Sequence, residues 1–99
     1  MARKITIDAI NAFMSAKPFY RDNTMVTIED YSIIQMSLYG HLIARREIGS
    51  NSVEVTNAGY FTNTTKERLN GIPGVSVCQR KGVWYLNGVE WDGSWKVVA

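Results

Sequence analysis

The sequence predicts an α+β fold in which a small, mostly antiparallel sheet of six to eight short strands packs against two helices. Three observations predict it. Apolar residues recur at helical spacing near the start, most of the later chain alternates with a period of two, and a short polar segment between the two halves carries helix-capping signals. The resulting order is α-β-β-β-(β)-α-β-β-β. A length of 99 residues fits a single α+β domain over residues 1–99.

The first helix is predicted from apolar residues that share one helical face: Ile7, Ile10, Phe13 and Met14. Thr6 is the expected N-cap, and Asp8 then lies in the first turn, where a negative charge suits the helix dipole. Pro18 ends the helix, because a proline disfavours the helical conformation of the residue before it. We expect both helices on the core side of the sheet.

An antiparallel meander of about four strands is predicted after this helix. Apolar and polar residues alternate within residues 25–29, 34–38, 41–47 and 53–56. Tyr39-Gly40 and Gly49-Ser50-Asn51 are the expected turns. A short second helix follows, since Thr64 and Glu67 match a capping box with Thr64 as the cap. Gly71 is a natural stop for that helix, and Pro73 prevents its continuation.

Short strands separated by turn signals fill the rest of the chain, at residues 75–79, 83–86, 89–91 and 94–98. Lys81-Gly82 is the first turn. Asn87-Gly88 is the strongest hairpin signal, because a type I′ turn needs positive φ at both of its central positions. Asp92-Gly93 is a signal of the same kind and predicts a further hairpin.

The composition is that of a globular protein, with 45% apolar and 20% charged residues. No apolar run approaches the roughly 18–20 residues of a membrane helix, and we expect no signal peptide and no membrane partner. Cys78 is the single cysteine, which excludes an internal disulfide and a zinc site built from several cysteines. These features predict a reducing compartment, the cytoplasm of a cell.

Catalysis is not expected. A nucleophile needs a base within hydrogen-bond reach, but Cys78 and the single histidine, His41, lie on different predicted strands. Cys78 is expected to be a buried, inert thiol, and His41 to be solvated or locally bonded beside its turn. No metal-ligand cluster or phosphate-binding glycine loop is found, so no cofactor is expected. A small hydrolase that uses two of the nine acidic residues is the third alternative, because no local pattern favours it.

A basic segment favours nucleic-acid or nucleotide binding. Between residues 62 and 88, four basic residues stand against one acid, Glu67, so the segment carries +3 while the whole chain carries +2. A polar, basic helix followed by a basic-tipped hairpin is typical of a winged helix and its wing, and we expect the two to form one functional surface. The predicted contact residues are Asn63, Thr65, Lys66, Arg68, Asn70, Arg80, Lys81 and Trp84.

A structural explanation of the same residues stays open. Trp84 and Leu86 alternate with Val83 and Tyr85, so one of these pairs must face the core. Residues 53–56 are predicted as a strand, where a winged helix would place another helix. In that case the residues around Thr64 would only cap the helix, and Lys81 at the hairpin tip would only be solvated.

Aromatic residues at predicted turns favour a protein interface instead. They are expected to stay partly exposed, and exposed aromatic residues with arginine nearby are typical of interface hot spots. The aromatic residues are Tyr20, Tyr31, Tyr39, Tyr60 and Phe61, and the arginines are Arg21, Arg45 and Arg46.

Several stretches of the sequence form a recognisable set: MARKIT (1–6), AINAF (9–13), NAGY (57–60), NTTKERLNG (63–71), WYLNG (84–88) and WDG (91–93). They resemble a family of small uncharacterised proteins from tailed bacteriophages. The resemblance implies a phage accessory protein made inside a bacterium, of a kind that often acts by binding a host factor, nucleic acid or a signalling molecule. It carries over no activity and no site residue.

The sequence therefore predicts a phage-type accessory binding protein without catalysis, located in the cytoplasm of the bacterial host cell. The leading function is nucleic-acid or nucleotide binding through residues 62–81. The alternative is a protein-interaction module that binds and inhibits a host defence or regulatory protein. An exposed edge strand could also pair across a homodimer.

Overall fold

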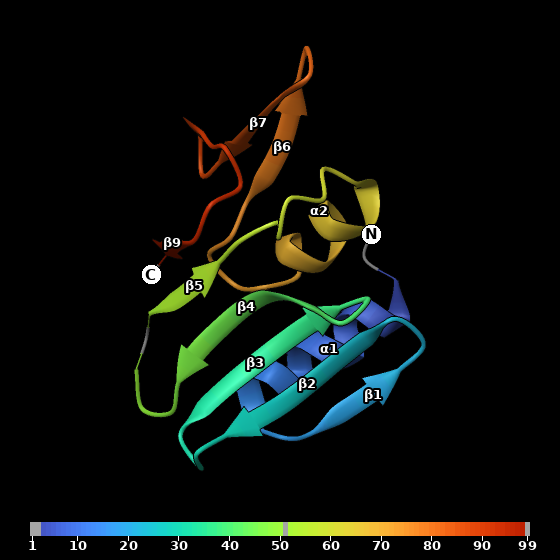
Figure 1. The fold of residues 1–99 in the computed structure, drawn as a ribbon, viewed down its shortest axis with the longest axis vertical. Helices are drawn as coiled ribbons and strands as arrows, with labels where there is room; N and C mark the ends of the chain where they lie inside the picture. The colour runs from blue at the N-terminus through green and yellow to red at the C-terminus, as the bar shows by residue number, and fades with distance from the viewer. Residues whose placement is uncertain (1–2, 51, 99) are drawn as a thin grey trace.

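The computed structural model describes residues 3–50 and 52–98, and within them the chain forms two helices and nine strands in two antiparallel sheets (Figure 1). The helices are α1 (Lys4–Ser15) and α2 (Asn63–Asn70). The predicted α+β class is confirmed, since a helix, a run of strands, a second helix and further strands follow in the expected order. Of the predicted turns, only Asn51 lies outside the described residues.

The larger sheet has the strand order β1-β2-β3-β4-β5-β9. Its strands are β1 (Phe19–Arg21), β2 (Thr24–Glu29), β3 (Ile33–Leu38), β4 (His41–Glu47), β5 (Val53–Val55) and β9 (Lys96–Val98). The predicted meander corresponds to β2 through β5, and each of these strands pairs with the next in an antiparallel ladder. β1 is an additional strand that periodicity does not predict, because only three residues pair with β2.

The smaller sheet consists of β6 (Val77–Arg80), β7 (Val83–Leu86) and β8 (Val89–Glu90) in that order. The φ angles of Lys81 and Gly82 are 51° and 82°, and those of Asn87 and Gly88 are 51° and 83°. Both two-residue turns therefore have positive φ values at both positions, the type I′ geometry that was predicted for Asn87-Gly88. Figure 1 shows β6 and β7 extending away from the larger sheet.

The predicted hairpin at Asp92-Gly93 is wrong. The Asp92 carboxylate accepts hydrogen bonds from the backbone N–H and the hydroxyl of Ser94, at 3.0 and 2.7 Å, which turns the chain locally. The Gly93 carbonyl accepts hydrogen bonds from the Asn57 backbone N–H and the Thr56 hydroxyl. The chain therefore leaves the smaller sheet, and β9 pairs with β5. The result is nine strands in two sheets, where one sheet of six to eight strands was predicted.

Helix α1 begins at Lys4 with Arg3 at the N-cap position, so the predicted cap at Thr6 is wrong and Asp8 lies beyond the first turn. The buried face is also rotated from the predicted one, because Ile7 and Met14 are exposed. The side chains that face the core are Thr6, Ala9, Ile10 and Phe13. These residues still follow the helical period, but one of them is Thr6, a polar residue whose burial hydropathy alone does not predict.

Helix α2 is capped by Thr62, whose hydroxyl accepts a hydrogen bond from the Thr65 backbone N–H at 3.2 Å. The predicted cap at Thr64 is therefore wrong, and Glu67 turns toward α1 instead of reaching back along its own helix. Gly71 ends α2 as predicted, but its φ is −73°, so left-handed geometry is not the reason for the glycine.

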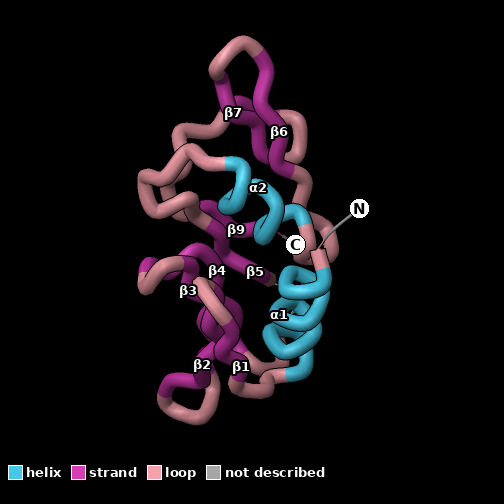
Figure 2. Tube along the Cα trace, turned by 90° about the vertical axis from the view of Figure 1, so that its right-hand side faces the viewer, coloured by secondary structure: helices cyan, strands magenta, loops and turns pink. Residues whose placement is uncertain are grey.

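Both helices lie on the same side of the larger sheet (Figure 2). The core between them joins the two sheets, and its buried residues include Phe13, Val26, Ile34, Met36, Ala44, Val55, Leu69, Trp84 and Leu86. Arg46 of β4 donates hydrogen bonds to the carbonyl oxygens of Phe13 and Met14, at 2.9 and 2.7 Å, and so caps the C-terminal end of α1. Among the described residues, no helix is long and apolar enough to cross a membrane.

Candidate functional site

Three of the eight predicted contact residues are buried. Arg68 is 1% exposed, Trp84 is 2% exposed, and Thr65 is buried at the start of α2. The alternation of Trp84 and Leu86 with their neighbours therefore places this tryptophan in the core, as the structural explanation predicted. A side chain buried in this way does not present a surface to a nucleic acid.

Arg68 instead joins α2 to α1 and to the start of β2. Its guanidinium donates to the hydroxyls of Thr6 and Thr24, at 2.7 and 3.0 Å, and to the side-chain oxygen of Asn23 at 3.3 Å. It also forms an ion pair with the neighbouring Glu67. The buried charge is thus paired and hydrogen-bonded, as a buried arginine requires.

Lys66 and Asn70 fasten α2 to the smaller sheet. The Lys66 ammonium donates to the Gln79 side chain at 3.0 Å and lies 5.5 Å from the centre of the Trp84 ring. The Asn70 side chain bonds to both the N–H and the carbonyl oxygen of Val77, at 2.6 and 2.9 Å. Lys66 and Asn70 therefore both have a structural role, since they hold α2 against β6.

Asn63, Arg80 and Lys81 complete the predicted set, and they are exposed, as is Asn70. Arg80 follows Gln79 in β6, and successive side chains of a strand point to opposite faces. Lys66 contacts Gln79, whereas the Arg80 guanidinium lies 5.7 Å from the ring centre of Tyr85. Lys66 and Arg80 therefore lie on opposite faces of β6.

The aromatic residues at turns are exposed, as predicted. Tyr39 and Tyr60 are 69% and 49% exposed, and they lie 21 residues apart in the numbering of the chain. Tyr39 belongs to the turn between β3 and β4, and Tyr60 belongs to the loop between β5 and α2. The structure brings these two turns together around a pocket.

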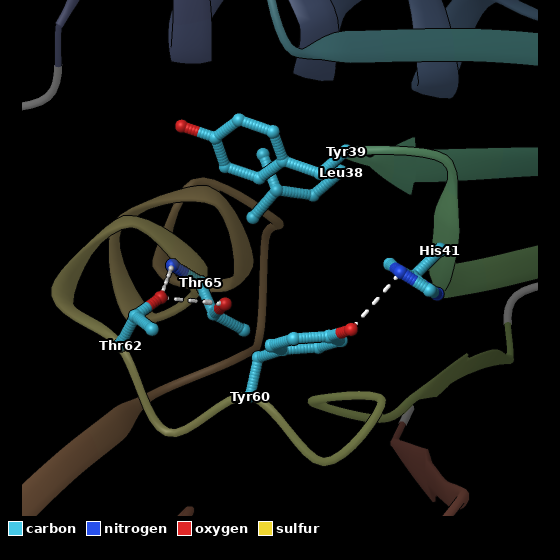
Figure 3. A pocket seen from close by; sticks show the side chains of 6 residues that line it. All are labelled: Leu38, Tyr39, His41, Tyr60, Thr62 and Thr65. Carbon is cyan, nitrogen blue, oxygen red and sulfur yellow. Dashed lines mark hydrogen bonds between the residues drawn. The ribbon is translucent and has the colours of Figure 1, made fainter.

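This pocket has a volume of about 160 Å³ and is lined by Leu38, Tyr39, His41, Tyr60, Thr62 and Thr65. Figure 3 shows Tyr39 and Tyr60 on opposite sides of it, with the Tyr60 hydroxyl directed toward His41. The Tyr60 oxygen lies 3.1 Å from His41 Nε2, and the two ring centres are 4.8 Å apart. His41 is exposed, as predicted, but its bond is not a local one, since Tyr60 is 19 residues away in sequence.

Two turns hold the tyrosines in place. Tyr39 and Gly40 have φ angles of 53° and 81°, which fits a two-residue hairpin turn between β3 and β4. The loop that carries Tyr60 is folded by Asn57, whose side-chain oxygen accepts from the Gly59 N–H and whose carbonyl accepts from the Tyr60 N–H. Both rings thus stand on short, hydrogen-bonded turns.

A second hollow lies on the other side of Tyr39, lined by Tyr20, Asp22, Asn23, Met25, Tyr39 and Gly40. Tyr39 lines both hollows and makes them neighbours. We call the side chains of Tyr20, Met25, Tyr39, His41 and Tyr60 the aromatic surface. It runs from β1 and β2 across the turn between β3 and β4 to the loop before α2.

The groups that could support catalysis are dispersed. Cys78 is exposed, so the predicted burial of its thiol is wrong. It lies on β6, whereas His41 lies on β4 of the other sheet. Among the described residues, no three His, Cys, Asp or Glu side chains come together as a metal site.

Two aspartates have a shifted pKa, and both lie outside the pocket. The hydrogen bond from Arg21 lowers the pKa of Asp8 below its usual value, and Lys4 lowers it further. The hydroxyl and backbone N–H of Ser94 lower the pKa of Asp92. Each shift stabilises the ionised form of a carboxylate that serves a local contact of the fold.

Fold and site together define a small α+β protein with an uncharged, aromatic-lined pocket. The sequence matches the family model described as Kyanoviridae Gp96 protein over residues 2–97, and the chain belongs to this phage protein family. The predicted resemblance to a phage family is therefore confirmed. No curated protein and no solved structure matches the chain.

Proposed function

We propose that this phage protein is a non-catalytic binding protein and that a protein partner binds to its aromatic surface. One observation supports this most: Tyr39, held on a tight turn, lines two neighbouring hollows, and the pocket on one side of it is lined by no Lys, Arg, Asp or Glu. Tyrosine is enriched among the residues that dominate binding energy in protein interfaces.

The charge around the pocket favours a protein over a nucleic acid. Nucleic-acid binding depends on lysine and arginine side chains that neutralise phosphates. The two predicted basic contacts on α2 do not line the pocket, since Lys66 bonds to Gln79 and Arg68 is enclosed in the core. An uncharged aromatic pocket instead suits an apolar group of a partner protein.

Site-specific photo-crosslinking tests the proposal. A photoreactive phenylalanine analogue replaces Tyr39 in one variant and Tyr31 in a matched control, because Tyr31 is 97% exposed in the turn at the other end of β3. In phage-infected cells, position 39 should give a discrete protein adduct that position 31 does not give. Excess unmodified protein should compete the adduct away, and excess Tyr39→Asn protein should not. Equal adducts at both positions, or none at position 39, would contradict the proposal.

A second candidate function is nucleic-acid binding by the hairpin tip. The observation in its favour is that Arg80, 5.7 Å from the centre of the Tyr85 ring, and Lys81 are both exposed at the end of β6. A mobility-shift titration against single- and double-stranded DNA and RNA, at low and physiological salt, tests it. Salt-sensitive retention that is lost in the Arg80→Ala/Lys81→Ala variant, but kept in a Lys17→Ala/Lys96→Ala control, would establish this function. No retention at low salt would eliminate it.

A further inference from the structure

We propose that the pocket between Tyr39 and Tyr60 receives a single aromatic side chain of the partner protein. The inference rests on the proposed function, because it names the group that the aromatic surface binds. It follows from the size of the pocket, the nature of its walls and the choice of residue at position 39.

The size of the pocket matches one ring. Its volume is about 160 Å³. An apolar protein cavity of roughly 150 Å³ accommodates a benzene molecule. A phenyl or phenol ring therefore fits, while a nucleotide with its sugar and phosphate would extend well beyond the pocket.

The walls of the pocket suit the faces and edges of a ring. Tyr39 and Tyr60 lie on its two sides (Figure 3), and Leu38, which is buried at the end of β3, contributes aliphatic surface. Aromatic pairs gain energy from offset-stacked or edge-to-face contact in addition to the burial of apolar area. A ring between two tyrosines can make such contacts on both sides, which an aliphatic side chain cannot.

The side-chain oxygens of Tyr60, Thr62 and Thr65 already bond within the lining. Tyr60 Oη pairs with His41 Nε2 at 3.1 Å, and the Thr62 hydroxyl accepts the Thr65 N–H and lies 3.0 Å from the Thr65 hydroxyl. The pocket thus offers no lysine or arginine to a phosphate or carboxylate. This lining selects an uncharged ring.

The identity of residue 39 is not explained by the turn. Tyr39 has a φ of 53°, and asparagine or glycine suits this position of a type I′ turn better than tyrosine. Since Lys81 has a φ of 51° in its own turn, the backbone alone marks no function, and what distinguishes Tyr39 is that its side chain lines both hollows. Tyr31, at a φ of 61°, occupies the same region of backbone space but lines neither hollow, which makes it a matched control.

The experiment is an NMR titration of the ¹⁵N-labelled full chain with amino-acid amides that mimic side chains within a polypeptide. N-acetyl-tyrosinamide and N-acetyl-phenylalaninamide should bind about tenfold more tightly than N-acetyl-leucinamide, because ring contacts add to apolar burial. Their shifts should map to the amides of Tyr39, Tyr60 and Thr65. Tyr39→Asn should weaken binding at least tenfold without loss of the folded spectrum, and Tyr31→Asn should leave it unchanged.

A further variant and two further ligands sharpen the result. Tyr60→Phe keeps the ring and should keep most of the affinity, whereas Tyr60→Ala should lose it. Free tyrosine that binds as tightly as the amides would assign the pocket to a free amino acid, and adenosine or uridine that binds more tightly would assign it to a nucleobase. Either result, or equal affinity for the leucine amide, would overturn the inference. A crosslinked protein at position 39 without amide binding would leave the proposed function standing and the ring pocket refuted.

Discussion

Arg68 and Thr6 are 62 residues apart in sequence, yet the guanidinium of the first donates a 2.7 Å hydrogen bond to the hydroxyl of the second. The contact joins α2 to α1 in the interior of the protein. Thr24 at the start of β2 accepts from the same guanidinium, so the larger sheet shares this junction. One buried cation therefore aligns both helices and a strand.

Loss of Arg68 should destabilise the fold strongly. Arg68→Ala should lower the free energy of unfolding by about 3 kcal/mol or more, because it removes one member of a buried charged network. Arg68→Lys should also be destabilising, since a single ammonium cannot reproduce the branched contacts of the guanidinium. Urea unfolding measures both. Lys66→Ala is the control on the same helix, with an expected loss of less than about 1 kcal/mol. Equal losses for Arg68→Ala and Lys66→Ala would refute the central role of Arg68.

Gly71 is a packing residue. A Cβ atom there would lie 2.7 Å from Thr6 Cγ2 and 2.8 Å from Ile10 Cγ1. Gly71→Ala should therefore cost about 1–3 kcal/mol of unfolding free energy, although alanine suits this φ. The double variant Gly71→Ala/Thr6→Ser should recover part of the loss, because it removes Cγ2 and keeps the hydroxyl for Arg68. Calorimetric midpoints test both steps, and a stabilised Gly71→Ala protein would contradict the close approach of the helices.

Gly93 and Asn57 are in tight contact. A Cβ atom on Gly93 would meet the Asn57 amide at 2.2 to 2.5 Å, and the φ of Gly93 is +90°. Gly93→Ala should cost roughly 2–4 kcal/mol of unfolding free energy, since steric and backbone strain combine. Gly82→Ala is the matched control, with a φ of +82° and no atom within 4 Å. Its cost should be about 1 kcal/mol. Similar losses at both glycines would show that the Asn57 contact contributes nothing.

The ion pair of Asp8 should make stability depend on pH in a defined direction. Its pKa is lowered in the folded protein by the Arg21 hydrogen bond. The pair therefore stabilises the fold above the unfolded pKa of about 3.9, and this contribution is lost as the pH falls through the lower folded pKa. Asp8→Asn should be less stable than the wild type at pH 7 and equally stable well below that window. Arg21→Gln removes the same hydrogen bond from the other partner and should show the same convergence in urea titrations.

Tyr39→Asn should make the fold more stable while it abolishes ring binding. Asparagine adopts the left-handed conformation at lower cost than tyrosine, so the free energy of unfolding should rise by about 0.5–1 kcal/mol. Tyr31→Asn should give a similar gain, because the two φ angles are alike. Thermal unfolding of both variants checks this. A loss of stability confined to Tyr39→Asn would mean that the ring supports the fold itself.

Local signals predicted much of this structure. The meander and the turn at Asn87-Gly88 depend on neighbours in sequence, and so their residues suffice to predict them. The pocket was beyond such reasoning, because Tyr39 and Tyr60 belong to turns 21 residues apart that only the tertiary fold brings to one pocket. The sequence predicts Arg68 as a nucleic-acid contact and not as a buried residue, because the hydroxyls and the amide that surround it come from distant segments.

The pairing of β9 with β5 has the same origin. Val53 lies opposite Val98, and no short-range pattern connects them. Asp92-Gly93 has the composition of a hairpin turn, but the Gly93 carbonyl bonds to Thr56 and Asn57 instead. A local preference was overridden there by a long-range contact.

The smaller sheet is inserted between two strands that pair with each other, β5 and β9. Its tip at Lys81-Gly82 is exposed and free of close neighbours around Gly82. Residues inserted at such an exposed hairpin tip do not alter the pairing of β5 with β9. The tip is thus a permissive place for an epitope tag or a fluorophore, which would report on binding at the aromatic surface from a distance.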